Sequence, residues 1–215
     1  MPQKDDFLSR LQAQLNETLE QTHKLDAAGR PGEALEVVRA AQRSILGLEP
    51  TLLHRLSSAD LLGLLGSGST PDLERTLGAA ELLSAEFELR AQQGEADPAQ
   101  ASKALELYLA VLGTEPGFAP LYSGRLDALT QGLNDALPPK TQRALAEAYR
   151  AAGRFATAEN WLYRWRDLEP DAAQGWAGLF YADLLGLSDE VLDAGGLPRD
   201  EVKEGLADVT GGVTT

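Results

Sequence analysis

The sequence predicts an all-α protein built from antiparallel helical hairpins, with about eight to ten helices. The composition favours this fold class, because the 215 residues include 39 Leu and 32 Ala but only 7 Val and 1 Ile. Leu and Ala have high helix propensity, whereas β-branched residues favour strands. The spacing of the apolar residues agrees with the composition, since they recur every three or four positions, as one face of a helix requires.

Two opening helices are predicted over about 5–28 and up to about residue 48. Gly29 lies just past the end of the first helix, where glycine commonly terminates helices. The turn Gly29-Arg30-Pro31-Gly32 is so short that the two helices are expected to pack antiparallel. Pro50 ends the second helix, because its ring disfavours helical geometry in the residue before it.

The rest of the N-terminal part, 1–138, is predicted to be helical but less regular. Ser57 and Asp60 have the spacing of a capping box, and a short apolar helix is expected to continue to Leu65. A loop over 66–69 follows. Further helices are expected from Thr70-Pro71 towards Gly94, from Asp97-Pro98 to Gly113, and over 119–136.

The chain is most regular over 139–186. Eight residues there form a pattern of apolar and turn-forming positions: Leu145, Tyr149, Gly153, Phe155, Ala158, Leu162, Trp165 and Pro170. This pattern resembles the tetratricopeptide repeat (TPR), a helix-turn-helix unit of 34 residues. A positive φ is expected at Gly153, and the small Ala158 lets the two helices approach closely. A step of 34 residues from Gln142 and Leu145 reaches Trp176 and Leu179, so the register continues into a third helix.

The resemblance implies a right-handed array of hairpins, a TPR-like α-α superhelix, whose first helices line a concave groove. We expect one TPR-like domain over 1–209, irregular over 1–138 and most repeat-like over 139–186. It is predicted to end with short helices over 188–193 and 199–209 and a flexible tail over 210–215. In its Leu61 to Leu65 block and its Ala101 to Leu112 helix, the chain is also similar to an uncharacterised bacterial family of repeat-like helical proteins.

Charge and composition restrict the partners and the compartment. The 33 acidic and 19 basic side chains give a net charge of −14, which repels phosphate backbones, so no nucleic-acid partner is expected. The N-terminus lacks the apolar block of a signal peptide, and no apolar run approaches the ~20 residues of a membrane span. We therefore expect a cytoplasmic protein without a membrane partner. The lack of Cys excludes disulfides, cysteine-ligated zinc and thiol nucleophiles.

No motif points to catalysis, a metal or a cofactor. Glu20 and His23 have the Glu-x-x-His spacing that di-iron bundles use, but Thr51 stands three residues before His54, so the second copy is missing. The stretch from Gly66 to Thr70 has the glycines of a phosphate loop without its lysine and preceding strand. We expect no enzyme, no cofactor and no metal, and the alternative is an enzyme with an unrecognised carboxylate-based site.

All three tryptophans cluster near the C-terminal end of the repeat-like region. Trp161, Trp165 and Trp176 lie within sixteen residues of one another. Aromatic residues at helical spacing are usually core residues, and here they would join the repeat to the helix that follows. The alternative is an exposed aromatic anchor that binds a partner.

A basic helix face is the candidate binding site. Residues 139–166 contain six basic and two acidic side chains, although the whole chain is acidic. Lys140, Arg143, Glu147 and Arg150 share one face of a predicted helix, opposite Leu145 and Tyr149. In tetratricopeptide repeats this face lines the groove, so the resemblance implies a site for a carboxylate or an acidic peptide. Simple salt bridges with neighbouring carboxylates are the other interpretation.

These observations predict a non-catalytic scaffold or adaptor that binds another protein or a peptide. A scaffold needs a docking surface rather than converging catalytic groups, and the basic face is a candidate for that surface. A homo-oligomeric structural protein is a further alternative, in which exposed leucines at 61–65 would pair two copies.

Overall fold

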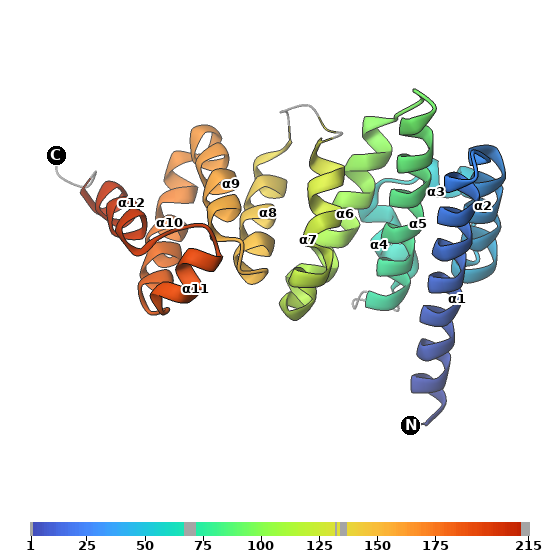
Figure 1. Ribbon diagram of the computed structural model, residues 1–215, viewed down its shortest axis with the longest axis horizontal. Helices are drawn as coiled ribbons and strands as arrows, with labels where there is room; N and C mark the ends of the chain where they lie inside the picture. Colours follow the sequence, from blue (N-terminus) through green and yellow to red (C-terminus); the bar gives the residue numbers. More distant parts are fainter. Residues whose placement is uncertain (1, 67–71, 132, 134–136, 212–215) are drawn as a thin grey trace. The chain divides into compact units, whose positions relative to one another are not determined.

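The protein is all-helical in the residues that its computed structural model describes, which are 2–66, 72–131, 133 and 137–211. No strand occurs there, and the predicted all-α fold class is confirmed. The α-helices follow one another along the chain (Figure 1). Within the described residues, a 3-10 helix, η1, precedes α7. They are α1 (Pro2–Ala27), α2 (Pro31–Leu46), α3 (Pro50–Arg55), α4 (Ser58–Leu65), α5 (Leu73–Gln92), α6 (Pro98–Thr114), η1 (Pro116–Phe118), α7 (Ala119–Gln131), α8 (Pro139–Ala151), α9 (Phe155–Leu168), α10 (Pro170–Leu185), α11 (Asp189–Ala194) and α12 (Arg199–Gly211).

The described residues form twelve α-helices rather than the eight to ten predicted, and some predicted helices differ at their ends. The Ser57 hydroxyl accepts a hydrogen bond from the Asp60 amide at 3.1 Å, as the capping pattern predicts. The helix expected over 119–136 ends at Gln131. Residues 210 and 211, expected to belong to a tail, are part of α12. The expectations for 67–71, 134–136 and 212–215 lie outside the described residues, and the described part of α5 follows Asp72, whose side chain caps it.

The sequence pattern does not predict α3. Its six residues are too few to show a helical apolar period, and a helix of this length is not stable alone. Pro50 stands in the first turn of α3. Amides in a first turn have no acceptor within the helix, so the missing N–H of proline costs no helical hydrogen bond. At its other end, Lys103 Nζ donates to the carbonyl oxygens of Leu53 and His54, both at 2.8 Å. Tertiary contacts therefore hold α3 in place.

The chain divides into two compact units. Unit 1 contains residues 1–111 and 125–134, and unit 2 contains residues 112–124 and 135–215, so the boundary passes through α6 and α7. Each unit has its own buried core and is described by itself below. The single domain over 1–209 stays a prediction.

Helix α5 is the centre of unit 1, because every residue from Gly78 to Phe87 is buried. A helix buried all round contacts neighbours on every side, and α1, α2 and α4 all pack against α5. At its N-terminal end, Arg75 donates to the carbonyl oxygens of Leu65 and Leu46 at 3.3 and 3.0 Å. The last carbonyl oxygens of a helix have no donor partner within it, so these bonds satisfy carbonyl groups at the C-terminal ends of α4 and α2.

The leucine block at 61–65 belongs largely to this core. Leu61 and Leu65 are fully buried, whereas Leu64 is exposed. A continuous exposed leucine patch, as the self-pairing hypothesis requires, is therefore absent from this segment.

Two hairpin turns share one backbone arrangement. Gly29, between α1 and α2, has a φ of 71°, and Gly153, between α8 and α9, has a φ of 73°. Both values favour glycine. In each turn, the amide of the following residue bonds to the carbonyl five residues earlier, from Arg30 to Leu25 and from Arg154 to Tyr149, at 2.9 Å. These short turns make α1 antiparallel to α2 and α8 antiparallel to α9 (Figure 1).

Unit 2 packs α9, α10 and α12 around the ring of Tyr181. This side chain is fully buried, and its hydroxyl donates to Glu159 Oε1 at 2.7 Å and lies 3.2 Å from the Tyr163 hydroxyl. A Cβ atom at Gly205 of α12 would overlap the Tyr181 ring. Helix α12 therefore reaches its position on α10 because residue 205 has no side chain.

We predict that Gly205→Ala lowers the free energy of unfolding by about 1 to 3 kcal/mol, because the tethered Tyr181 ring cannot move aside. Gly178→Ala is the matched control, since Gly178 lies inside α10 and no side chain comes within 4 Å of the position that its Cβ atom would take. It should raise the free energy of unfolding by about 0.5 to 1 kcal/mol. Urea denaturation measures both, and equal effects of the two substitutions would contradict the close packing of α12.

Candidate functional site

The basic face predicted on α8 lies at the surface of unit 2, with its arginines in ion pairs. Arg143 Nε donates to Glu147 at 2.9 Å, and Arg150 Nη1 donates to Asp183 of α10 at 2.6 Å. Lys140 is exposed and has no carboxylate partner among the described residues. The arginine side chains are 55% and 40% exposed, and ion pairs this exposed contribute little, so a partner can compete for these cations.

The three tryptophans differ in burial. Trp165 is 2% exposed, and its Nε1 donates to Glu169 at 3.1 Å, so it belongs to the core. Trp161 and Trp176 are half-buried. Trp176 meets Trp165 edge-on at 6.2 Å between ring centroids, and the Arg143 guanidinium lies 5.6 Å from the Trp165 centroid. Arg143 of α8, Trp165 of α9 and Trp176 of α10 are thus brought together.

Helix α10 adds a second stripe, of which the repeat pattern includes Trp176 and Leu179 but not Asp183. Trp176, Leu179 and Asp183 are spaced by three and four residues and share one helix face. The Arg150 to Asp183 ion pair and the contacts of Trp165 place this stripe beside the α8 face. Leu179 is 66% exposed. We call the combined area the α8–α10 surface, formed by Lys140, Arg143, Glu147, Arg150, Trp176, Leu179 and Asp183.

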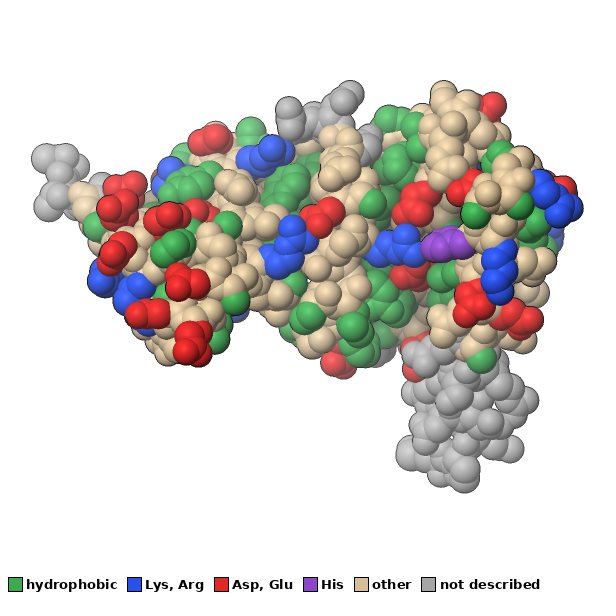
Figure 2. Space-filling view, in the orientation of Figure 1, with side chains coloured by type: hydrophobic (Ala, Val, Ile, Leu, Met, Phe, Trp, Pro, Cys, Tyr) green, Lys and Arg blue, Asp and Glu red, His purple; other side chains and the backbone are tan. Residues whose placement is uncertain are grey.

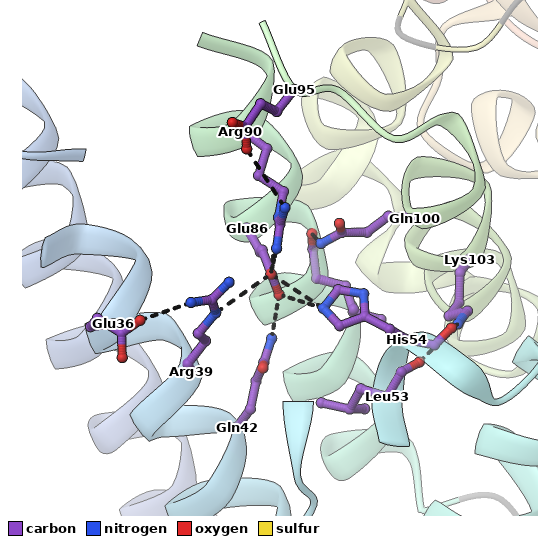
Figure 3. Close-up of polar contacts among 11 residues, drawn as sticks. Glu36, Arg39, Gln42, Leu53, His54, Glu86, Arg90, Glu95, Gln100 and Lys103 are labelled. Atoms are coloured by element: carbon purple, nitrogen blue, oxygen red, sulfur yellow. Dashed lines mark hydrogen bonds and ion pairs between the residues drawn. The ribbon is translucent and has the colours of Figure 1, made fainter. Parts of the chain in front are cut away.

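Unit 1 contains a second candidate site, centred on Glu86 of α5 (Figure 3). The Glu86 side chain is fully buried. Gln42 Nε2 of α2 donates to it at 3.0 Å, His54 Nε2 of α3 lies 3.2 Å away, and Arg90 donates through Nε and Nη2 at 3.1 Å. Arg39 Nε of α2 lies at 4.0 Å. One carboxylate therefore joins three helices and gathers two arginines and a histidine.

Two buried glutamates on α5 have opposite pKa shifts. Burial raises the pKa of Glu86, but hydrogen bonds from His54, Gln42 and Arg90 outweigh it and lower the pKa to about 2. Burial also raises the pKa of Glu81, and there Arg125 at 3.7 Å only partly opposes the rise. The difference comes from the number of donors, so Glu86 is a stable anion at neutral pH.

Arg39, His54 and Arg90, which surround Glu86, line a surface pocket of about 330 Å³. Cationic and polar side chains dominate its wall, which also includes two carboxylates. The lining residues are Glu36, Arg39, Arg43, Glu49, Pro50, Thr51, His54 and Arg90. We call this the arginine pocket.

His23 lines a different pocket of about 400 Å³ in unit 1, between α1 and α5, together with Asp26 and Glu88. Acidic, basic and histidine side chains gather over these two helices (Figure 2). Asp26 accepts a hydrogen bond from Gln92, and Glu88 accepts one from Arg125, both at 3.0 Å. In the described part of the chain, no three acidic or histidine side chains cluster closely enough to hold a metal ion, and no helix there has the length and apolar character to cross a membrane.

Sequence reasoning missed the Glu86 cluster because its members lie far apart in the chain. His54 stands 32 residues before Glu86, and Gln42 stands 44 residues before it. One signal was present: α5 carries Glu81 and Glu86 within a stretch that is otherwise mainly apolar and small. Two acidic residues in a helix that is buried all round require polar partners from neighbouring helices.

Comparison with known proteins identifies a family without assigning an activity. A family model described as "Family of unknown function (DUF6483)" matches residues 3–212. No curated protein and no solved structure matches the chain. Function is therefore inferred from the two candidate sites.

We predict that Trp165→Ala lowers the free energy of unfolding by about 3 to 5 kcal/mol, as other large-to-small core substitutions do. Trp161→Ala is the control, because that ring is only half-buried and lies beside the Arg164 guanidinium at 4.8 Å. Its effect should be clearly smaller. Chemical denaturation followed by circular dichroism checks both, and a loss below about 0.5 kcal/mol for Trp165→Ala would mean that its ring is not part of the core.

We predict that Glu86 makes the protein acid-sensitive. Its pKa of about 2 lies below its ordinary value of 4.5, so its stabilising contribution is complete above about pH 4.5 and is lost as the pH falls towards 2. The contribution is about 3 kcal/mol. The stability gap between the wild type and Glu86→Gln, measured by urea denaturation, should therefore shrink over this range.

Glu95→Gln is the control for this experiment. The Glu95 side chain is 66% exposed and lies 3.9 Å from Arg90, so its removal should leave the acid dependence of the wild type unchanged. A gap between wild type and Glu86→Gln that stays constant from pH 7 to pH 3 would show that Glu86 is not held as an anion.

Proposed function

We propose that this chain, which belongs to the family of unknown function (DUF6483), is a non-catalytic scaffold that binds a protein or peptide segment through the α8–α10 surface. The observation that carries the proposal is Leu179, which is 66% exposed on the same face of α10 as Asp183, the ion-pair partner of Arg150 on α8. An apolar centre with a charged rim is the usual anatomy of a protein interface.

A TPR-like arrangement within unit 2 is part of this proposal. It is supported by the α8–α9 hairpin, by the left-handed conformation of Gly153 and by the burial of Tyr149, Ala158 and Leu162. In such an arrangement α8 and α10 are the first helices of consecutive hairpins, and their exposed faces line one groove. A right-handed superhelix along the whole chain stays a prediction.

The chemistry of the surface favours an acidic segment with an apolar residue. The surface contains three basic side chains, Lys140, Arg143 and Arg150, against Glu147 and Asp183, in a chain whose net charge is −14. A partner carboxylate near Lys140 and Arg143 would form charge-assisted hydrogen bonds. A neighbouring apolar side chain would cover Leu179 and the half-buried Trp176. A second copy of this chain is a less favoured partner, because two strongly acidic molecules repel each other.

The proposal predicts that a displayed library of random peptides, selected against the full chain, yields sequences with acidic residues next to an apolar one. Leu179→Ser should lower the affinity for the selected peptides at least about tenfold, because burial of a leucine contributes about 1.5 to 3 kcal/mol. Lys140→Glu should lower this affinity further. Both side chains are exposed, so the melting temperature should not change.

Leu168→Ser is the matched control, since Leu168 is a similarly exposed leucine of unit 2, at 56%, on α9 rather than on the α8–α10 surface. It should leave peptide affinity unchanged. Selection of no common pattern, or equal losses from Leu179→Ser and Leu168→Ser, would contradict docking on this surface. If the mass rises with concentration in the wild type but not in Leu179→Ser, the partner at this surface is a second copy of the chain rather than a peptide.

A further inference from the structure

The arginine pocket of unit 1 gathers more cationic groups than its structural role requires. Burial of Glu86 demands donors, and Gln42, His54 and Arg90 already supply hydrogen bonds to it. Arg39 approaches the same carboxylate only to 4.0 Å, and Arg43 pairs with Glu49 instead. Both arginines nevertheless line the pocket beside His54 and Arg90.

Buried and exposed carboxylates contribute differently to this pocket. Glu86 is fully buried and cannot leave its donors. Glu36 and Glu49, which pair with Arg39 and Arg43, are 67% and 68% exposed. Exposed pairs of this kind contribute little to stability, so an entering anion can displace these two side chains into water.

The guanidinium groups retain donors for such an anion. Arg43 uses Nε for Glu49 at 3.0 Å, and a guanidinium carries five N–H donors. Because Glu86 fixes Arg90 and attracts Arg39, part of the wall is ordered before a ligand arrives, which lowers the entropic cost of binding. A volume of about 330 Å³ admits a small molecule.

We propose that the arginine pocket binds the oxyanion group of a small molecule, a phosphate or a carboxylate, through Arg39, Arg43 and Arg90. Planar guanidinium groups match both oxyanions with paired hydrogen bonds. Glu86 accepts two hydrogen bonds from Arg90 and so fixes this arginine in the wall of the pocket. This site lies in unit 1 and does not depend on the α8–α10 surface, so either proposal can fail without the other.

Calorimetric titration of the full chain tests the proposal, with inorganic phosphate and succinate as probes and chloride of matched ionic strength as the reference. Binding of at least one probe at a single site is expected. Phosphate binding alone would identify a phosphate ligand, and succinate binding alone would identify a carboxylate ligand. Arg43→Gln should weaken binding about tenfold. Glu49→Gln should strengthen it about threefold, because it removes the competing carboxylate.

Arg30→Gln and Glu33→Gln form the matched control pair, because Arg30 and Glu33 make a similar exposed ion pair at the start of α2, outside the pocket. They should leave the affinity unchanged. The Arg43 side chain is 49% exposed and pairs with the exposed Glu49, so Arg43→Gln is expected to fold normally, which its melting temperature verifies. No saturable binding of either probe, an affinity unaffected by Arg43→Gln, or equal losses from Arg43→Gln and Arg30→Gln would each overturn the proposal.

Discussion

A carboxylate that is withdrawn from water needs hydrogen-bond donors, and Glu86 takes them from three helices of unit 1. Gln42 comes from α2, His54 from α3, and Arg90 from α5 itself. Without these donors the buried charge would cost several kcal/mol. The position of the short helix α3, which has no independent stability, is therefore tied to this one charge and to the Lys103 bonds at its end. The same requirement places cationic side chains around a surface pocket, so a constraint of folding also creates a candidate binding site.

Unit 2 is built on a different principle. Its core includes the buried aromatic rings of Tyr149, Trp165 and Tyr181, and the ion pairs of α8 and α10 are exposed. Close approach there depends on glycine at position 205, which leaves room for the Tyr181 ring. Because the ion pairs of α8 and α10 are exposed, a partner can compete for these side chains. The two candidate sites thus differ in kind: one is held by a buried ion, and the other is an open surface on an apolar core.

The sequence was most informative where structure depends on local signals. Gly29 and Gly153 marked two turns, Ser57 marked a helix start, and the repeat pattern marked Tyr149, Ala158 and Leu162 as core. It was least informative where structure depends on contacts between distant residues. Helix α3 is too short for a periodic signal, and the Glu86 cluster joins residues up to 44 positions apart. The exposure of Leu179 could not be predicted for the same reason. An apolar residue at helical spacing predicts burial, but the neighbouring helices determine whether its side chain is in fact covered.

The most direct test of the role given to Glu86 is its protonation, measured by the carboxyl ¹³C chemical shift during an acid titration of the folded protein. A Glu86 signal that remains in the ionised range as the pH falls through 4.5 is the expected result, in line with a pKa of about 2. Protonation of Glu86 at or above pH 4.5 would show that its donors do not outweigh burial. The carboxylate would then not be the anion that organises α2, α3 and α5.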